Sequence, residues 1–320
     1  MPHRYRASSW LRGAHAQTLW PLLRKAALPD YRRERWDTPD GDFIDLDWIA
    51  GPATAPLLAL FHGLEGGSRS HYSRALMHAV RQRSWRGVVV HFRSCSGEPN
   101  RLPRAYHSGD SAEIDWILRR LSSGGPLFAL GISLGGNALL KWLGEQGAAA
   151  RTPIKAAAAI SAPLDLAASA AALTQGFNRL YARHFLNSLI PKALAKLQRF
   201  PGLYRADAVR AARSLHAFDA VVTAPLHGFR DVADYYARSG AGQFLGGIAV
   251  ATLLVNARND PFLPAAALPE PGQLPACVTL ETPDDGGHVG FVSGAFPGRL
   301  EWLPARILDF FEQEIEARDK

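Results

Sequence analysis

The sequence is poor in cysteine and in lysine. Its 320 residues include two cysteines, Cys95 and Cys277, too few for a disulfide framework or for a zinc site, which takes about four ligands. Only 6 of its 36 basic residues are lysines, so 30 are arginines. The formal net charge of +7 raises the question of nucleic-acid binding, but the arginines are scattered and no recognition motif accompanies them. We therefore interpret the charge as a compositional bias toward arginine and expect no nucleic-acid partner.

Long apolar runs are also missing. No stretch approaches the ~18 apolar residues that a membrane-spanning helix needs, and the first 30 residues mix charge, histidine and tryptophan instead of forming a signal peptide's apolar core. We expect no membrane span and a cytoplasmic protein, and we leave contact with a membrane surface open. Hydrophobic residues make up 47% of the chain and charged residues 20%, which is typical of a globular protein and excludes a disordered or fibrous one.

What is present is an alternation of short apolar runs with segments of helical spacing. Strands are predicted at 35–38, 43–49, 57–61, 87–92, 127–130, 156–161, 248–255 and 278–281, and helices at 70–84, 109–121, 138–146 and 302–317. Short, fully apolar strands that alternate with helices are typical of a parallel sheet buried on both faces. The predicted fold is therefore α/β, with a mostly parallel sheet of about eight strands and helices on both faces.

Two segments interrupt this alternation. Residues 1–30 are predicted to form an irregular N-terminal arm with a few apolar anchors, and residues 31–320 one domain. The 86 residues from 162 to 247 are too many for a single crossover between strands. Within them, 163–215 are rich in Ala, Leu and Arg, and we expect a helical cap inserted over the strand ends.

The sharpest motif is Gly131-Ile132-Ser133-Leu134-Gly135, which matches G-x-S-x-G between a predicted strand and a predicted helix. Here a serine lies on a turn so tight that side chains in place of the glycines would strike the neighbouring strand or helix. The serine hydroxyl projects into a cleft at a helix N-terminus, whose dipole favours negative charge. We predict Ser133 to be a nucleophile; the alternative is a glycine-rich turn without chemistry.

A serine nucleophile needs a base and an acid that orients the base. In folds with this motif the acid and then the histidine follow the serine along the chain, and His288 is the one histidine beyond residue 227. Asp260 lies just past the predicted strand 248–255, where ligand chemistry gathers in open α/β sheets. We therefore predict His288 as the base and Asp260 as the acid. His62 precedes the serine and ends a buried strand, so we interpret it as structural.

Two backbone N–H groups are expected to stabilise the oxyanion of an acyl-transfer reaction. One belongs to Leu134, directly after the serine, and the other to Leu64, in the loop after the strand 57–61. Cys95 follows a strand and is a rival nucleophile, but no histidine-paired motif supports it, and a turn cysteine is the simpler interpretation. The motifs imply no metal and no organic cofactor.

Together these motifs resemble the YheT-like branch of the α/β-hydrolase superfamily, which includes ABHD-type lipases and yeast ethyl-ester synthases. The resemblance covers nearly the whole chain and also rests on His15-Ala16-Gln17-Thr18-Leu19, Thr38-Pro39-Asp40-Gly41-Asp42-Phe43, His62-Gly63-Leu64-Glu65-Gly66, Ser96-Gly97-Glu98-Pro99-Asn100, Tyr106-His107-Ser108-Gly109, Phe218-Asp219, Thr223-Ala224-Pro225 and Asp234-Tyr235-Tyr236. It implies an α/β-hydrolase fold, the triad Ser133, Asp260 and His288, and an ester hydrolase. Ser94 stands where the family has glycine in an Asn-Phe-Arg-Gly-Cys stretch, and we expect it to alter that turn.

We therefore predict hydrolysis of short- to medium-chain or lipid-like carboxylic esters through an acyl-enzyme on Ser133. The alternatives are acyl transfer to an alcohol by the same triad and a non-catalytic ligand-binding protein, whereas epoxide hydrolases and dehalogenases use Asp where Ser133 stands. The expected partner is a small-molecule ester, and the sequence predicts no oligomeric state. Tyr235, Tyr236 and Phe185 are candidate substrate-binding residues. They and the cap's apolar stripe suit either core packing or an acyl-chain site: Phe177, Leu180, Tyr181, Phe185, Leu186 and Leu189.

Overall fold

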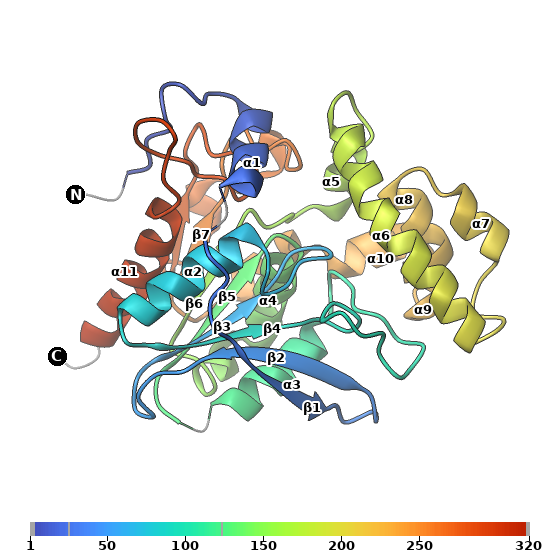
Figure 1. Ribbon diagram of the computed structural model, residues 1–320, viewed down its shortest axis with the longest axis horizontal. Coiled ribbons are helices and arrows are strands. Elements are labelled where there is room, and N and C mark those ends of the chain that lie inside the picture. Colours follow the sequence, from blue (N-terminus) through green and yellow to red (C-terminus); the bar gives the residue numbers. More distant parts are fainter. Residues whose placement is uncertain (1–3, 25, 123, 318–320) are drawn as a thin grey trace.

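An eight-stranded sheet lies at the centre of the computed structural model, which describes residues 4–24, 26–122 and 124–317 (Figure 1). Residues 1–3 and 25 of the predicted arm, and 123 and 318–320 of the predicted domain, lie outside the described residues. The strands are β1 (Arg32–Asp37), β2 (Phe43–Ile49), β3 (Leu57–Phe61), β4 (Arg86–Val90), β5 (Leu127–Ile132), β6 (Ala156–Ile160), β7 (Thr252–Val255) and β8 (Val278–Glu281). Their order is β1-β2-β4-β3-β5-β6-β7-β8, with β2 antiparallel to both neighbours and every other pair parallel. The predicted mostly parallel sheet is confirmed.

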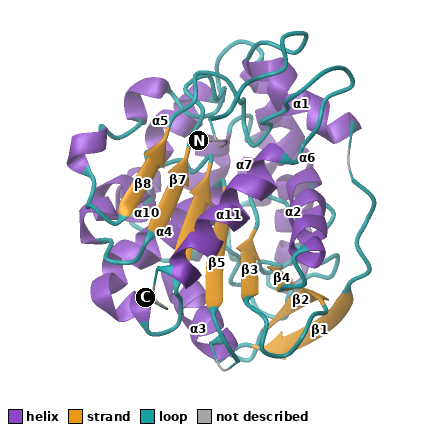
Figure 2. Cartoon of the chain, turned by 90° about the vertical axis from the view of Figure 1, so that its left-hand side faces the viewer, coloured by secondary structure: helices purple, strands orange, loops and turns teal. Residues whose placement is uncertain are grey.

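Helices cover both faces of this sheet (Figure 2). Successive residues of a strand point to opposite faces, so Leu57, Ala59 and Phe61 of β3 join one hydrophobic cluster and Leu58 and Leu60 join the other. The first cluster is completed by α3 (Ser111–Leu121) and α4 (Leu134–Gln146), and the second by α2 (His71–Gln82) and α11 (Trp302–Glu316). Burial on both faces explains why β3 is apolar at every position.

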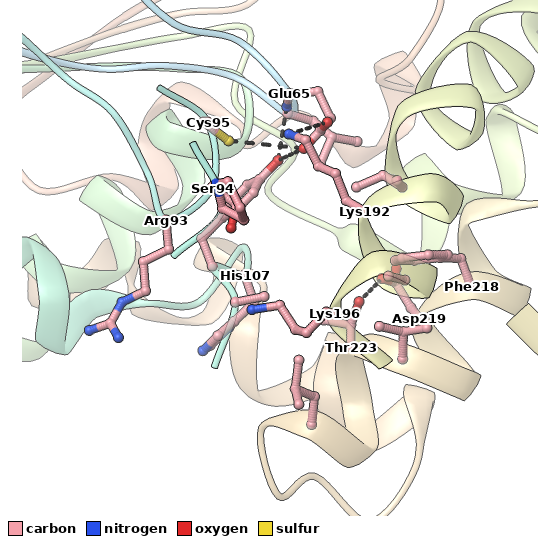
Figure 3. A pocket seen from close by; sticks show the side chains of 18 of the residues that line it. Glu65, Arg93, Ser94, Cys95, His107, Lys192, Lys196, Phe218, Asp219 and Thr223 are labelled. Carbon is pink, nitrogen blue, oxygen red and sulfur yellow. Dashed lines mark hydrogen bonds and ion pairs between the residues drawn. The ribbon is translucent and has the colours of Figure 1, made fainter. Parts of the chain in front are cut away.

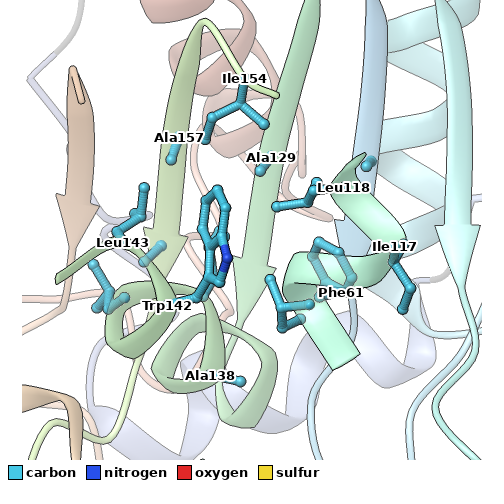
Figure 4. Packing of buried hydrophobic residues seen from close by; sticks show 14 of the residues in the cluster. Phe61, Ile117, Leu118, Ala129, Ala138, Trp142, Leu143, Ile154 and Ala157 are labelled. Carbon is cyan, nitrogen blue, oxygen red and sulfur yellow. The ribbon is translucent and has the colours of Figure 1, made fainter. Parts of the chain in front are cut away.

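The indole of Trp142 on α4 is the largest fully buried side chain. It packs against the sheet beside Ala129 of β5 and Ala157 of β6 (Figure 4). Alanine at these strand positions leaves space for the ring, so the small side chains of β6 and the large one of α4 are complementary. This contact holds α4, the helix that follows the predicted nucleophile, against the strands.

The predicted strand at 248–255 is too long, because β7 begins at Thr252. Residues Ala241–Gly247 form a 3₁₀ helix, and Ile248 and Val250 enter the first hydrophobic cluster without belonging to a strand. A short buried segment has the same apolar composition as a buried strand, so periodicity alone does not separate the two.

The N-terminal arm is not irregular throughout, as predicted, because Ala14–Leu23 form helix α1. This helix buries Gln17 and Thr18 and exposes Leu22 and Leu23. That is the reverse of the pattern by which an amphipathic helix is recognised, which explains why the apolar periodicity missed it.

Several helices occupy the long interval between β6 and β7. They are α5 (Leu166–Ala172), α6 (Asn178–Arg199), α7 (Ala206–Ala211), α8 (Leu215–Phe218), α9 (Ala224–Leu226) and α10 (Val232–Ser239), with a π-helical turn at Asp219–Thr223. Helices α6 and α7 form a layer that projects to one side of the sheet (Figure 1). A separate hydrophobic cluster holds this layer together and reaches Val222, beyond residue 215. That the segment acts as a cap stays a prediction.

Candidate active site

Ser133 is the single residue between the end of β5 and the start of α4, and its backbone is left-handed, with φ 52°. The turn is as crowded as its glycines suggest. A Cβ on Gly131 would lie 2.5 Å from the carbonyl oxygen of Gly135, and one on Gly135 would lie 2.3 Å from the carbonyl oxygen of Phe61. A side chain at either glycine would therefore push the strand and the helix apart. The hydroxyl of Ser133 lies at the N-terminus of α4, where the helix dipole stabilises negative charge.

The structure brings Ser133, His288 and Asp260 into one hydrogen-bonded chain. The Nε2 atom of His288 lies 3.0 Å from Ser133 Oγ, and its Nδ1 atom lies 2.8 Å from Asp260 Oδ2. Because an ionised carboxylate only accepts hydrogen bonds, Nδ1–H is the donor to Asp260, which leaves the Nε2 lone pair to accept the Ser133 proton. The Asp260 side chain is fully buried and its other oxygen, Oδ1, accepts a bond from the backbone N–H of Phe262. The three groups have the geometry required for general-base activation of the hydroxyl.

Three contacts hold the imidazole of His288 and the backbone that carries it. The ring of Phe262 stacks on it with 4.2 Å between centroids. The Oδ1 atom of Asn259 accepts a bond of 2.9 Å from the backbone N–H of Gly287, the residue before the histidine. The hydroxyl of Thr18 on α1 accepts a bond of 2.9 Å from the backbone N–H of His288 itself. These contacts were not predicted; for Thr18 the available signal is the His15–Leu19 motif, and for Asn259 its place next to Asp260.

Leu64 and Leu134 carry the two predicted oxyanion donors. Neither backbone N–H donates to another group within the described residues. The loop that holds Leu64 passes directly over the serine, since a Cβ on Gly63 would lie 3.1 Å from Ser133 Cβ. On either side of Leu64 the N–H groups are occupied: that of Gly63 bonds Tyr72 and that of Glu65 bonds Tyr106. Two free N–H groups near the serine hydroxyl can stabilise a developing oxyanion.

Glu65 connects this loop to α6. Its Oε2 atom lies 2.7 Å from Lys192 Nζ and accepts a hydrogen bond from Ser188, while Oε1 accepts a bond of 2.9 Å from the Tyr106 hydroxyl. The Glu65 side chain is buried, so this carboxylate is neutralised within the protein. Further along α6, Lys196 Nζ donates to the carbonyl oxygens of Leu102 and Arg104, and burial lowers its pKa to about 8. Polar contacts thus dock α6 on the loops that surround the serine.

Two cavities meet at this loop. The first, which we call the cleft, has a volume of about 680 Å³ and is lined by Ser133, His288 and residues of α1 and α6. The second, the inner cavity, has a volume of about 570 Å³, is largely apolar and lies beneath α6 (Figure 3). Leu64 and Glu65 line both, and Leu134 lines the inner cavity. The two predicted oxyanion donors therefore lie where the two spaces join.

The candidate substrate-binding residues are divided between these spaces. Phe185 lines the cleft and Tyr235 lines the inner cavity, where its hydroxyl accepts a bond of 3.0 Å from the backbone N–H of Ser108. Tyr236 lines neither; its hydroxyl donates to Asp219, which does line the inner cavity. Burial raises the pKa of the Asp219 carboxyl to about 6, even though Thr223 and Tyr236 both donate to it.

The rival residues have other roles. His62 is fully buried, its Nδ1–H donates to the carbonyl oxygen of Gly63, and its Nε2 accepts from the backbone N–H of Phe92. Burial lowers the pKa of His62 to about 3, so it remains neutral. Burial raises the pKa of the Cys95 thiol to about 12, so a reactive thiolate is not available at neutral pH.

The backbone at Ser94 is left-handed, with φ 64°, the conformation that the family's glycine adopts without strain.

No helix in the part of the chain that the structure describes is long and apolar enough to cross a membrane. No group of three or more His, Cys, Asp or Glu side chains among the described residues is placed to hold a metal ion.

Comparison with known proteins finds a family model, similar sequences and a solved structure of similar fold. Residues 56–295 match the alpha/beta hydrolase fold family. The chain is 40% identical to the putative esterase YheT of Escherichia coli (strain K12), over 95% of this chain and 92% of that protein. It is 29% identical to the phospholipase ABHD3 of Mus musculus, over 98% of this chain and 79% of that protein. The solved structure of the Pyrococcus furiosus esterase Pf2001 is similar in fold, with a TM-score of 0.58 at 15% identity, over 89% of this chain and 92% of that one.

Proposed function

The chain belongs to the α/β-hydrolase fold family and to its YheT-like branch, and we propose that it is a serine esterase that hydrolyses carboxylic esters. One observation carries the proposal: the 3.0 Å approach of His288 Nε2 to Ser133 Oγ, continued by the 2.8 Å contact of Nδ1 with Asp260. The relatives named esterase and phospholipase support the same class of reaction.

The proposed reaction proceeds in two halves. His288 Nε2 takes the proton of the Ser133 hydroxyl while Oγ attacks the ester carbonyl carbon, and the oxyanion accepts hydrogen bonds from the N–H groups of Leu64 and Leu134. Collapse of this intermediate breaks the bond to the alkoxy oxygen, which leaves as the alcohol with the proton from His288. Water, deprotonated by the same nitrogen, then attacks the acyl-enzyme and releases the carboxylic acid. Asp260 remains ionised and stabilises the imidazolium in both halves.

The inner cavity is the proposed acyl site. It opens beside the two oxyanion donors, its volume of about 570 Å³ is typical of small-molecule sites, and its walls include Leu189, Phe218 and Val222. The cleft on the other side of Ser133 then receives the alcohol portion. With this assignment Tyr235 contacts the acyl group and Phe185 contacts the alcohol portion. Tyr236 affects the acyl site only through its hydrogen bond to Asp219.

The test is a series of p-nitrophenyl esters from acetate to palmitate, hydrolysed by the wild type and by Ser133→Ala. We expect Ser133→Ala to lower kcat by at least about a thousandfold. The acyl-chain length at which kcat/KM is greatest then indicates how long an acyl chain the inner cavity accommodates. The matched control is Ser122→Ala, which removes an exposed serine hydroxyl and should retain full activity. Equal rates for the wild type and Ser133→Ala would overturn the mechanism.

Acyl transfer is distinguished by the products. With ethanol added, a transferase forms the ethyl ester faster than the free acid, whereas an esterase forms mainly the acid. A non-catalytic binding protein would hydrolyse none of the esters and would not react with a fluorophosphonate probe that labels a control esterase.

A further inference from the structure

Large exposed apolar side chains are confined to a few segments of the described chain. They are Leu19, Leu22, Leu23, Leu28, Phe177, Leu180 and Phe296. Four of the seven belong to the N-terminal arm, and Phe177 and Leu180 lie at the start of α6. Leu23 is 76% exposed, Leu180 56% and Phe177 45%. Neither alternative offered by the sequence, core packing or an acyl channel, accounts for Phe177 and Leu180.

These segments meet at the mouth of the cleft. The ring of His15 on α1 lies 4.5 Å from the ring of Phe177, and its Nδ1 atom lies 3.2 Å from the hydroxyl of Tyr181 on α6. Leu19 and Leu22 line the cleft together with Ser133. The exposed leucines of α1 and the exposed residues at the start of α6 therefore border the same opening, and we call Leu19, Leu22, Leu23, Phe177 and Leu180 the mouth patch.

The two segments that carry the mouth patch have charge of one sign. The sequence has no Asp or Glu between residues 1 and 29, nor between 166 and 206. Arg24 at the end of α1 and Arg179 and Arg183 on α6 are exposed, and none has an acidic partner among the residues that the structure describes. Among the described residues that line the cleft, Glu65 is the one carboxylate, and it is paired with Lys192. An apolar patch bordered by unpaired guanidinium groups is complementary to an anionic lipid surface.

We propose that the mouth patch docks on an anionic phospholipid membrane, with the cleft facing the bilayer. The leucines and Phe177 would enter the boundary between headgroups and acyl chains, and the arginines would contact lipid phosphates. An ester lipid then passes from the bilayer into the cleft without crossing water. This inference deepens the proposed function, on which it depends for the class of substrate.

A second copy of the chain is the rival occupant. A two-fold dimer through this patch would place the same arginines opposite one another without acidic residues between them, which is unfavourable. A membrane that contains anionic lipid supplies the missing negative charge, and for this reason we prefer it.

The test is sedimentation with vesicles of phosphatidylcholine alone or of phosphatidylcholine and phosphatidylglycerol in equal amounts. We expect binding to the anionic vesicles only, with weakening as salt is added. The double variant Arg179→Glu, Arg183→Glu should bind at least about tenfold more weakly, since each cation near an anionic surface contributes a factor of about five. The matched control is Arg210→Glu, Arg213→Glu, with the same change of charge at and just after α7, away from α1 (Figure 1).

The apolar part of the patch is tested with Leu23→Ser, Leu180→Ser, which should also lose vesicle binding. All these variants should hydrolyse a water-soluble acetate ester with kcat/KM unchanged within about twofold, because none of the altered side chains lines the cleft or the inner cavity. That measurement separates loss of docking from loss of fold.

Three results would overturn the proposal. The wild type could remain in the supernatant with anionic vesicles, or the α7 control could lose as much binding as the α6 variant. Light scattering could instead show a dimer that Leu23→Ser, Leu180→Ser dissociates, which would assign the patch to a second copy. Vesicle binding without hydrolysis of any ester would contradict the proposed esterase function and leave the docking surface intact.

Discussion

The hydroxyl of Thr18 accepts a hydrogen bond of 2.9 Å from the backbone N–H of His288, which lies 270 residues later in the chain. The same hydroxyl donates to the carbonyl oxygen of Ala14 one turn earlier in α1. Beside it, Gln17 is fully buried, and its Oε1 atom accepts a bond of 2.8 Å from the backbone N–H of Val292. The N-terminal arm therefore holds the loop that carries the proposed catalytic base at two places, His288 itself and Val292.

Thr18 is consequently a positioning residue, and Thr18→Val should lower kcat about ten- to a hundredfold with little change in KM. The substitution leaves a partly buried N–H without a partner, which costs up to about 1–3 kcal/mol, and a small displacement of the imidazole reduces the rate strongly. The measurement is steady-state hydrolysis of a soluble ester. Thr18→Ser restores the acceptor and should restore kcat; equal losses in both variants would mean that Thr18 only contributes to packing.

Asp260→Asn should lower kcat by about a thousandfold or more, because the amide does not stabilise the imidazolium and favours the wrong tautomer of His288. The circular dichroism spectrum should match that of the wild type. The matched control is Asp284→Asn, a change in the loop before His288 whose carboxylate is largely exposed and lies 3.7 Å from Arg258. Comparable activity losses in the two variants would argue against Asp260 as the residue that orients the base.

Cys95 should be chemically inert. Burial is the main cause that raises the pKa of its thiol to about 12, and the nearby Glu65 carboxylate adds to it. At pH 8 only about one thiol in ten thousand is ionised, so iodoacetamide should not inactivate the enzyme, and Cys95→Ser should retain activity. Rapid inactivation at pH 8 that Cys95→Ser prevents would contradict this prediction.

Asp219 should make stability depend on pH. Its pKa is raised by burial to about 6 in the folded protein, while a carboxyl in the unfolded chain titrates near 4. The protonated form stabilises the fold below pH 4, and this contribution is lost as the pH rises through 6. The measurement is the Tm of the wild type and of Asp219→Asn between pH 4 and 7. We expect the wild type to lose stability relative to the variant over this range; a constant difference would contradict the raised pKa.

Local patterns account for what could be predicted. The apolar strand β3 lies where the sequence places it, since complete burial leaves an unbroken apolar run and turn residues end it. Gly131 and Gly135 identify the tight turn at Ser133 because the steric requirement acts within a few residues. The error at 248–255 has the same origin, because a local pattern does not show whether a buried segment pairs with a strand.

The contacts that position the site follow no such pattern. The polar residues Gln17 and Thr18 are buried on α1 because their partners, Val292 and His288, arrive from the other end of the chain. Glu65 is in the same situation, since its partner Lys192 lies on α6. Nothing in the spacing of residues near Glu65 identifies that lysine.

By itself the sequence determined the fold class, the turn at Ser133 and the order of the candidate triad, because periodicity, glycine sterics and motif order act along the chain. Only the tertiary structure decided that α1 supports His288, that α6 docks on the loop of Leu64, and that two exposed leucines of α1 line the cleft. Hydrogen bonds and ion pairs form between whichever groups packing brings within about 3 Å, and sequence separation does not limit them.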